Sequence, residues 1–154
     1  MEFSTLNFID NAFVPAQSGL FLDNHCPATG LVVSVLPRST AEDVDAAVAA
    51  AKAAYPGWSR TPAPARAALL DRVADLLEKY APELAAMESE DSGKTLKMAK
   101  ETDIPRAIAN FRFFAGAIRH DHGGAAFHSA DSVNYTSRHP LGVAALITPW
   151  NLPL

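Results

Sequence analysis

The sequence has little that would attract nucleic acid or a membrane. Its 13 lysines and arginines face 17 aspartates and glutamates, so the net charge is −4 and no basic surface is indicated. No apolar run reaches the ~18 residues that a membrane helix needs. The first residues lack the basic stretch and apolar core of a secretory signal. We therefore expect a cytoplasmic protein with no nucleic-acid and no membrane partner.

Cysteine is almost absent as well. Cys26 is the only one, which excludes an internal disulfide and suits a reducing compartment. His25 precedes it, but neighbours in an extended segment point in opposite directions, so we interpret Cys26 as a small, half-buried residue and not as a nucleophile. His120 and His122 stand at a helix end without a carboxylate cluster. Polar surface is favoured there over a metal pair, and no metal site is expected.

Short strands are indicated in the first third of the chain. Asp10-Asn11 divides the apolar residues of 7–14 and tolerates the positive φ of a tight hairpin turn. Residues 21–30 lead into a Pro/Gly turn. Residues 31–37 then form a β-branched strand that Pro37 ends.

The first helix that the sequence predicts begins at Ser39 or Thr40. Glu42 and Asp43 are placed for a capping box, and Pro56-Gly57 is expected to stop the helix. Its apolar stripe consists of Val44, Val48, Ala51 and Tyr55.

Two more helices follow a short Pro-rich loop. The second is expected to run to about Tyr80, the third to hold Pro82 in its first turn and to stop at Gly93 in a left-handed conformation. The residues of the second helix expected to point inward are Leu69, Leu70, Val73, Leu76 and Leu77.

A fourth helical region begins near Thr95. Pro105 is expected to kink or restart it, with Asp103 as the candidate cap, and residues 120–124 to end it. Its apolar stripe is formed by Ile104, Ile108, Phe111, Ala115 and Ile118.

Two strand patterns complete an α/β chain. Residues 132–139 alternate between polar and apolar, as a strand solvated on one face does, whereas residues 142–148 are continuously apolar, as in a strand covered on both faces. Ligands of open parallel sheets bind beyond the carboxyl ends of such strands. Residues 148–151, which read TPWN, occupy that place.

Asn151 is the first candidate functional residue. Pro149 and Pro153 restrict the backbone around it, and a carboxamide held in this way can donate a hydrogen bond from a fixed position, as an oxyanion stabiliser must. The alternative is an asparagine in a Pro-rich turn that bonds its own backbone.

Arg106 is the second candidate. At helical spacing it lies about 160–200° away from the apolar stripe that contains Ile104 and Ile108, and Phe113 shares its face. An arginine and an aromatic ring on a non-core face could line a pocket. The alternative is a solvated arginine beside a partly buried phenylalanine.

Several motifs agree with one family in both order and spacing. They read NFIDNAFV, PATG, AEDVDAAVAAAKAAYPGW, RAALLDRVADLLE, ESEDSGKTL and RHPLGVAALITPWN, followed by LPL. Over nearly its whole length the chain resembles the aldehyde dehydrogenase superfamily. The stretch SGKTLKMAKETDIPRAIANFRFFA, together with PWNLPL, resembles the branch that oxidises aminomuconic and hydroxymuconic semialdehydes, intermediates of aromatic-compound breakdown.

The resemblance implies oxidation of an aldehyde to an acid with NAD, NADP not being excluded, through a cysteine thiohemiacetal. It gives Asn151 the role of oxyanion donor and Leu152 a place in the substrate tunnel. It also places Arg106 and Phe113 on a helix that borders this tunnel, where a guanidinium could hold a substrate carboxylate. The residues it implies at the cofactor are Ile147, Thr148, Pro149, Trp150 and Asn151.

The family's nucleophilic cysteine, glutamate base and phosphate-binding glycine loop lie beyond PWN, so we expect an inactive amino-terminal portion of a longer enzyme. Residues 1–122 would begin the cofactor-binding domain, 123–140 would form an oligomerisation strand, and 141–154 would start a Rossmann-like sheet. A homo-oligomer acting on a small aldehyde is implied for the full-length form. The alternatives are a truncated product that binds full-length subunits and a separate nucleotide-binding domain, which the missing glycine loop disfavours.

Overall fold

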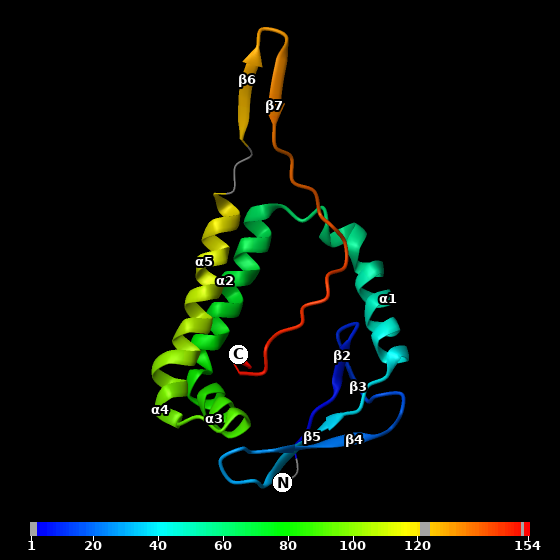
Figure 1. The fold of residues 1–154 in the computed structure, drawn as a ribbon, viewed down its shortest axis with the longest axis vertical. Coiled ribbons are helices and arrows are strands. Elements are labelled where there is room, and N and C mark those ends of the chain that lie inside the picture. The colour runs from blue at the N-terminus through cyan, green and yellow to red at the C-terminus, as the bar shows by residue number, and fades with distance from the viewer. Residues whose placement is uncertain (1–2, 121–123, 152) are drawn as a thin grey trace.

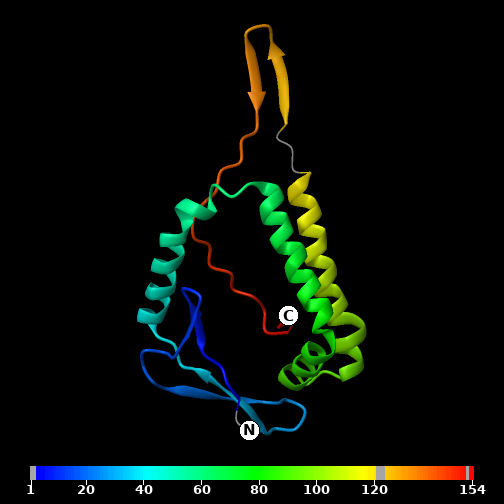
Figure 2. The same cartoon turned by 180° about the vertical axis from the view of Figure 1, so that it is seen from behind.

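The computed structural model describes residues 3–120, 124–151 and 153–154. A small sheet lies at the base of the molecule, helix α1 rises on one side of it and a pair of helices, α2 and α5, on the other (Figure 1). Seen from behind, the same arrangement shows a hairpin projecting beyond the helices (Figure 2). The base sheet has the order β1-β5-β4, with β1 parallel and β4 antiparallel to β5. Its strands are β1 (Phe3–Ser4), β4 (Phe21–His25) and β5 (Val32–Pro37).

The first hairpin confirms the turn read from the sequence. Strands β2 (Asn7–Ile9) and β3 (Ala12–Val14) pair antiparallel. Asp10 and Asn11 between them have φ values of 52° and 60°, the left-handed pair that a two-residue hairpin turn requires. The strand that Pro37 was expected to end also finishes there.

Helix α1 (Ala41–Trp58) has Thr40 as its N-cap, one of the two residues predicted for that position. The Asp43 carboxylate accepts hydrogen bonds from the Thr40 N–H at 2.8 Å and from the Gln17 N–H at 2.9 Å. The helix ends at Trp58, one residue beyond the Pro56-Gly57 pair that was expected to stop it, so Pro56 lies inside the helix. Proline lacks the backbone N–H donor, and a helix tolerates that loss in its last turn. The Pro56 carbonyl accepts a hydrogen bond from the Arg60 Nε–H at 2.7 Å.

Helices α2 (Ala63–Lys79) and α5 (Ile104–Arg119) lie side by side (Figure 1). Arg112 of α5 bonds Asp75 at 3.1 Å and Glu78 at 2.9 Å, and Arg119 bonds Asp71, so the two helices run antiparallel. The fully buried residues of the pair are Ala67, Ala74, Ile104 and Ala115.

The inward face predicted for α2 is only partly right. Leu70 and Leu77 are half-buried, but Leu69, Val73 and Leu76 are exposed, because the contact with α5 is made on the alanine side of the helix. Helix α1 differs in the same way: Val48 and Tyr55 of its predicted stripe are half-buried, whereas Val44 and Ala51 are exposed. The stripe of α5 is confirmed, with every member buried or half-buried.

Between α2 and α5 the chain forms α3 (Ala81–Ser92), α4 (Leu96–Met98) and the π-helical turn η1 (Ala99–Asp103). Pro82 lies in the first turn of α3, and Gly93 ends it with φ 72°, both as predicted. Thr95 caps α4 by accepting a hydrogen bond from the Met98 N–H. The core cluster of this region contains Ala85, Ala99 and Ile104.

Strands β6 (Ala125–Ser129) and β7 (Ser132–Tyr135) form the projecting hairpin, so the strand predicted at the start of 132–139 is confirmed as far as Tyr135. From Thr136 the chain turns back and passes between α1 and the α2–α5 pair (Figure 1). Among the described residues, no helix is both long enough and apolar enough to cross a membrane.

Candidate functional site

The strand expected over residues 142–148 is not formed. Residues 136–149 belong to no helix or strand, and the side chains of Leu141, Leu146 and Ile147 are 102%, 86% and 95% exposed. A continuous apolar strand needs neighbours on both sides, and no other strand in the described part of the chain pairs with it. The Tyr55 hydroxyl donates to the Pro140 carbonyl at 3.1 Å, and the Thr136 N–H donates to the Gly124 carbonyl at 2.9 Å.

The TPWN residues lie at the end of this exposed segment. Trp150 is 89% exposed and forms a turn with Asn151, which is exposed too, as are Thr148 and Pro149. Within the described residues the Asn151 carboxamide makes no hydrogen bond, so the alternative of an asparagine bonded to its own backbone is not observed there. Leu152 lies outside the described residues.

Arg106 and Phe113 are both exposed on α5. The Phe113 ring meets Phe114 edge-on at 5.2 Å between centroids. Arg106, Asn110 and Leu154 line a cavity of about 80 Å³. The fold therefore brings Arg106 to the segment that carries Asn151, at a point three residues beyond that asparagine, whereas no cavity described here includes Asn151 or Phe113.

An ionic cluster borders the same cavity, and sequence reasoning missed it. The Lys94 ammonium bonds Glu88 Oε1 at 3.2 Å and Asp103 Oδ2 at 3.1 Å, and these carboxylate side chains are only 2% and 5% exposed. Burial alone would lower the pKa of Lys94, but the hydrogen bonds to Asp103 and Glu88 outweigh it and raise that pKa. Asp103 was expected to cap a helix; it pairs with Lys94 instead and makes no cap bond.

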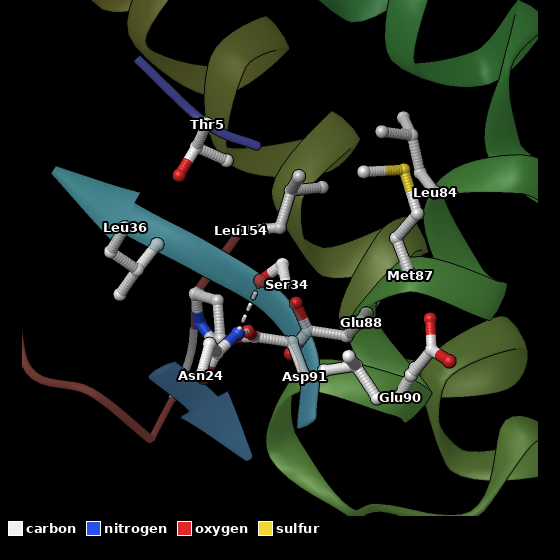
Figure 3. Close-up of a pocket in the computed structure, with 12 residues that line it drawn as sticks. Thr5, Asn24, Ser34, Leu36, Leu84, Met87, Glu88, Glu90, Asp91 and Leu154 are labelled. Carbon is white, nitrogen blue, oxygen red and sulfur yellow. Dashed lines mark hydrogen bonds between the residues drawn. The ribbon is translucent and has the colours of Figure 1, made fainter. Parts of the chain in front are cut away.

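A larger cavity of about 510 Å³ lies between the base sheet and α3 (Figure 3). Its walls include Leu36, Leu84 and Met87, and the chain end at Leu154 reaches into it. The Asn24 amide crosses the gap, donating to Ser34 Oγ at 3.0 Å and Asp91 Oδ1 at 2.7 Å. Pro153 and Leu154 thus lie against both the sheet and α3.

Cys26 is buried, with 5% exposure, more deeply than the sequence indicated. A hydrogen bond with the Thr29 side chain lowers the pKa of its thiol against the opposing effect of burial. His25 contacts only the Gly30 carbonyl among the bonds found here, at 3.3 Å, and His122 lies outside the described residues. The described residues contain no group of three or more side chains that could hold a metal ion.

Comparison with known proteins places this geometry in a family. The profile of the aldehyde dehydrogenase family matches residues 13–154. The chain belongs to this family of enzymes that act on aldehydes, as its sequence motifs predicted, and it corresponds to the amino-terminal part of the family's fold.

Among the curated relatives is bovine (Bos taurus) 2-aminomuconic semialdehyde dehydrogenase, which is 48% identical over 96% of this chain and 30% of its own length. The human enzyme of the same name is 45% identical. The chain thus spans about 30% of the length of the curated relatives it matches.

Solved structures agree with the fold. PnpE from Pseudomonas sp. WBC-3 superposes with a TM-score of 0.91 at 39% identity, over 100% of this chain and 31% of PnpE. The indole-3-acetaldehyde dehydrogenase AldA of P. syringae, solved in complex with NAD+, superposes with a TM-score of 0.92 at 32% identity, over 100% of this chain and 32% of AldA.

Residues 147–151 were predicted to flank the cofactor. The segment from Ile147 to Asn151 is exposed, and none of the cavities found here runs along it.

Proposed function

We propose that this chain is the amino-terminal part of an NAD(P)-dependent aldehyde dehydrogenase that oxidises a carboxylate-bearing semialdehyde to the acid. The observation that carries the proposal is the family match over residues 13–154, together with 48% identity to a 2-aminomuconic semialdehyde dehydrogenase. Two observations support the carboxylate-bearing substrate: a relative named for a semialdehyde, and an exposed Arg106 that has no partner among the described residues.

Asn151 has the part of oxyanion donor in this proposal. Its carboxamide N–H₂ donates a hydrogen bond to the substrate carbonyl oxygen as negative charge develops there. Pro149 and Pro153 limit the backbone conformations around it, and the exposed carboxamide has no competing partner among the described residues. Ile147, Thr148, Pro149 and Trp150 would flank the cofactor, and Leu152 would line the substrate path.

Arg106 has the part of the group that holds the substrate's second charge. A guanidinium presents a planar fork of donors that matches a carboxylate, and Arg106 makes no hydrogen bond or ion pair with the residues that the structure describes. Phe113, two helical turns further along α5, would contribute an apolar wall to the substrate site. The oligomer of the full-length enzyme would involve hairpin β6–β7, whose strands have free edges among the described residues.

The test uses a chimera in which residues 1–154 replace the aligned segment of bovine 2-aminomuconic semialdehyde dehydrogenase. We expect NADH formation from succinic semialdehyde, and Asn151→Ala should lower kcat by about 10²–10³-fold, as removal of an oxyanion donor does. Asn151→Asp keeps the size but replaces the N–H₂ donor, and should be as damaging. An Asn151→Ala chimera with undiminished kcat would contradict the assignment, as would a folded chimera without activity.

A second candidate is a product that binds full-length subunits without turnover. The projecting hairpin favours this possibility. Co-purification of the 154-residue chain with a full-length relative would support it, and deletion of residues 125–135 should then abolish co-purification.

A further inference from the structure

A π-helical turn precedes α5 directly. The Ile104 N–H donates to the Ala99 carbonyl, five residues back, where an α-helix would reach four. Pro105 explains the position of this turn, because proline has no N–H and its ring clashes with the carbonyl of the residue four positions earlier, here Glu101. The wider turn gives that carbonyl room. The sequence indicated a kink at Pro105, and the π-turn is the form it takes.

The π-turn decides the direction in which α5 presents its side chains. It contains one residue more than an α-turn, which rotates everything after it by about 100° relative to the helix before it. Arg106 is the third residue after the turn. If residues 99–103 relaxed to an α-helical turn, the guanidinium would move to a different face of the helix.

Two contacts hold the last residue of the π-turn and the one after it. The Asp103 carboxylate, with its side chain 5% exposed, is bound to Lys94 at 3.1 Å, and Lys94 is bound in turn to Glu88 at 3.2 Å. Ile104 is 1% exposed and packs in the core cluster with Ala85. The ionic contact and the apolar contact together fix the rotation of the helix at this point.

The loop that supplies Lys94 is itself held in place. A Cβ added at Gly93 would lie 3.0 Å from Pro27 Cβ and 3.2 Å from the Ala28 nitrogen, so the backbone fits closely against the turn after β4. The Lys94 carbonyl accepts a hydrogen bond from the Ser89 hydroxyl at 2.6 Å. Lys94 therefore extends from a backbone with little freedom to move.

The ionic cluster and Arg106 share one cavity. Glu88, Asp103, Arg106 and Asn110 all line the space of about 80 Å³ at the chain end. Two carboxylates against one ammonium leave a single negative charge beside the guanidinium. Without Lys94, two uncompensated carboxylates would face Arg106 and compete with any ligand carboxylate.

We propose that Lys94, Asp103 and Glu88 are positioning residues that hold the π-turn closed and so aim Arg106 at the carboxylate of the substrate. This inference rests on the proposed function of Arg106. It goes beyond that function because it assigns the specificity of the site to an ion cluster that touches neither aldehyde nor cofactor.

The experiment compares succinic semialdehyde with propionaldehyde in the chimera described above. Asp103→Asn and Lys94→Met should each raise KM for the carboxylated substrate at least about tenfold, since a misplacement of about 1 Å can cost about 10²-fold. The kcat and the KM for propionaldehyde should stay within about twofold. Glu101→Gln is the matched control, since it removes one carboxylate charge from the same π-turn at an exposed position. It should change the KM of neither aldehyde.

The two main variants change the charge of the cavity in opposite directions. Asp103→Asn removes a negative charge and Lys94→Met removes a positive one, so an effect of charge alone would move KM in opposite directions, and that result would overturn the proposal. A rise in both is expected from a positioning role. Hydrogen exchange of the Ile104 amide should also accelerate in both variants and not in Glu101→Gln, because that amide makes the π-turn bond.

Arg106→Ala separates failure of this inference from failure of the proposed function. If Arg106→Ala raises KM for both substrates equally, the carboxylate-binding function is wrong and the inference falls with it. If Arg106→Ala raises KM only for succinic semialdehyde, but Asp103→Asn and Lys94→Met do not, the proposed function stands and the inference is wrong. Should Asp103→Asn fail to fold, Glu88→Gln keeps the Lys94–Asp103 pair and is expected to give a smaller selective rise; no rise would refute the proposal.

Discussion

Gly93 is the position where a single methyl group should be most informative. Its φ of 72° lies in the left-handed region, where a side chain costs about 1–2 kcal/mol. The added Cβ of Gly93→Ala would also stand 3.0 Å from Pro27 Cβ and 3.2 Å from the Ala28 nitrogen, atoms that belong to backbone or to a rigid ring. Overpacking of this kind costs about 1–3 kcal/mol. The expected loss in free energy of unfolding is therefore about 2–5 kcal/mol.

Gly30 provides the matched control. Its φ is also 72°, but nothing lies within 4 Å of a Cβ built there. Gly30→Ala should lose only the conformational part, about 1–2 kcal/mol. Urea unfolding followed by circular dichroism measures both variants on the 154-residue chain. Equal losses would refute the close contact between the Gly93 loop and the turn after β4, and with it the rigid base that we assign to Lys94.

Two further predictions concern the cap of α1 and the core. Hydrogen bonds from the Thr40 and Gln17 N–H groups lower the pKa of Asp43 below its ordinary 3.8, so this carboxylate stabilises the fold above about pH 3.8 and ceases to do so as pH falls through its folded-state pKa. Asp43→Asn should therefore lower Tm near neutral pH, with the difference from wild type shrinking in acid. Ile104→Ala should lower the free energy of unfolding by about 2–5 kcal/mol, against about 0.5 kcal/mol or less for Leu69→Ala at an exposed position. Similar losses for the two would contradict the placement of the core.

Local features of the fold followed well from the sequence. Asp10-Asn11, Thr40 with Asp43 and Gly93 each have a stereochemical reason to stand where they do, and that reason acts within a few residues. The apolar stripe of α5 was also correct, because that helix has a single apolar face.

Features that depend on distant contacts were not predictable. Helix α2 has an alanine face and a leucine face, and periodicity alone favours the larger side chains, whereas the structure packs Ala67 and Ala74 against α5. Small residues let two helices approach closely, and their partner is decided by the rest of the fold. Asp103 was taken for a cap because its partner, Lys94, lies nine residues earlier, in the loop between α3 and α4.

The candidate site also has a part that the sequence indicated and a part that only the fold reveals. Proline spacing and helical periodicity raised Asn151 and Arg106 as candidates, and the family resemblance supplied their roles, which stay predictions. The cavity that Arg106 shares with Leu154 and the buried carboxylates arises from the folded path of the chain, and no pattern in the sequence contains it.

The exposed segment between Pro140 and Pro149 has a consequence for assembly. A proline at each end limits the conformations of the adjoining residues, and the segment already follows an elongated course (Figure 1). Its backbone amides and carbonyls are thus arranged to pair with another β-strand. Pairing with a segment that is already extended loses less conformational entropy than ordering a free coil does. A strand should therefore pair here fast and should bury the apolar side chains of Leu146 and Ile147 as it does so.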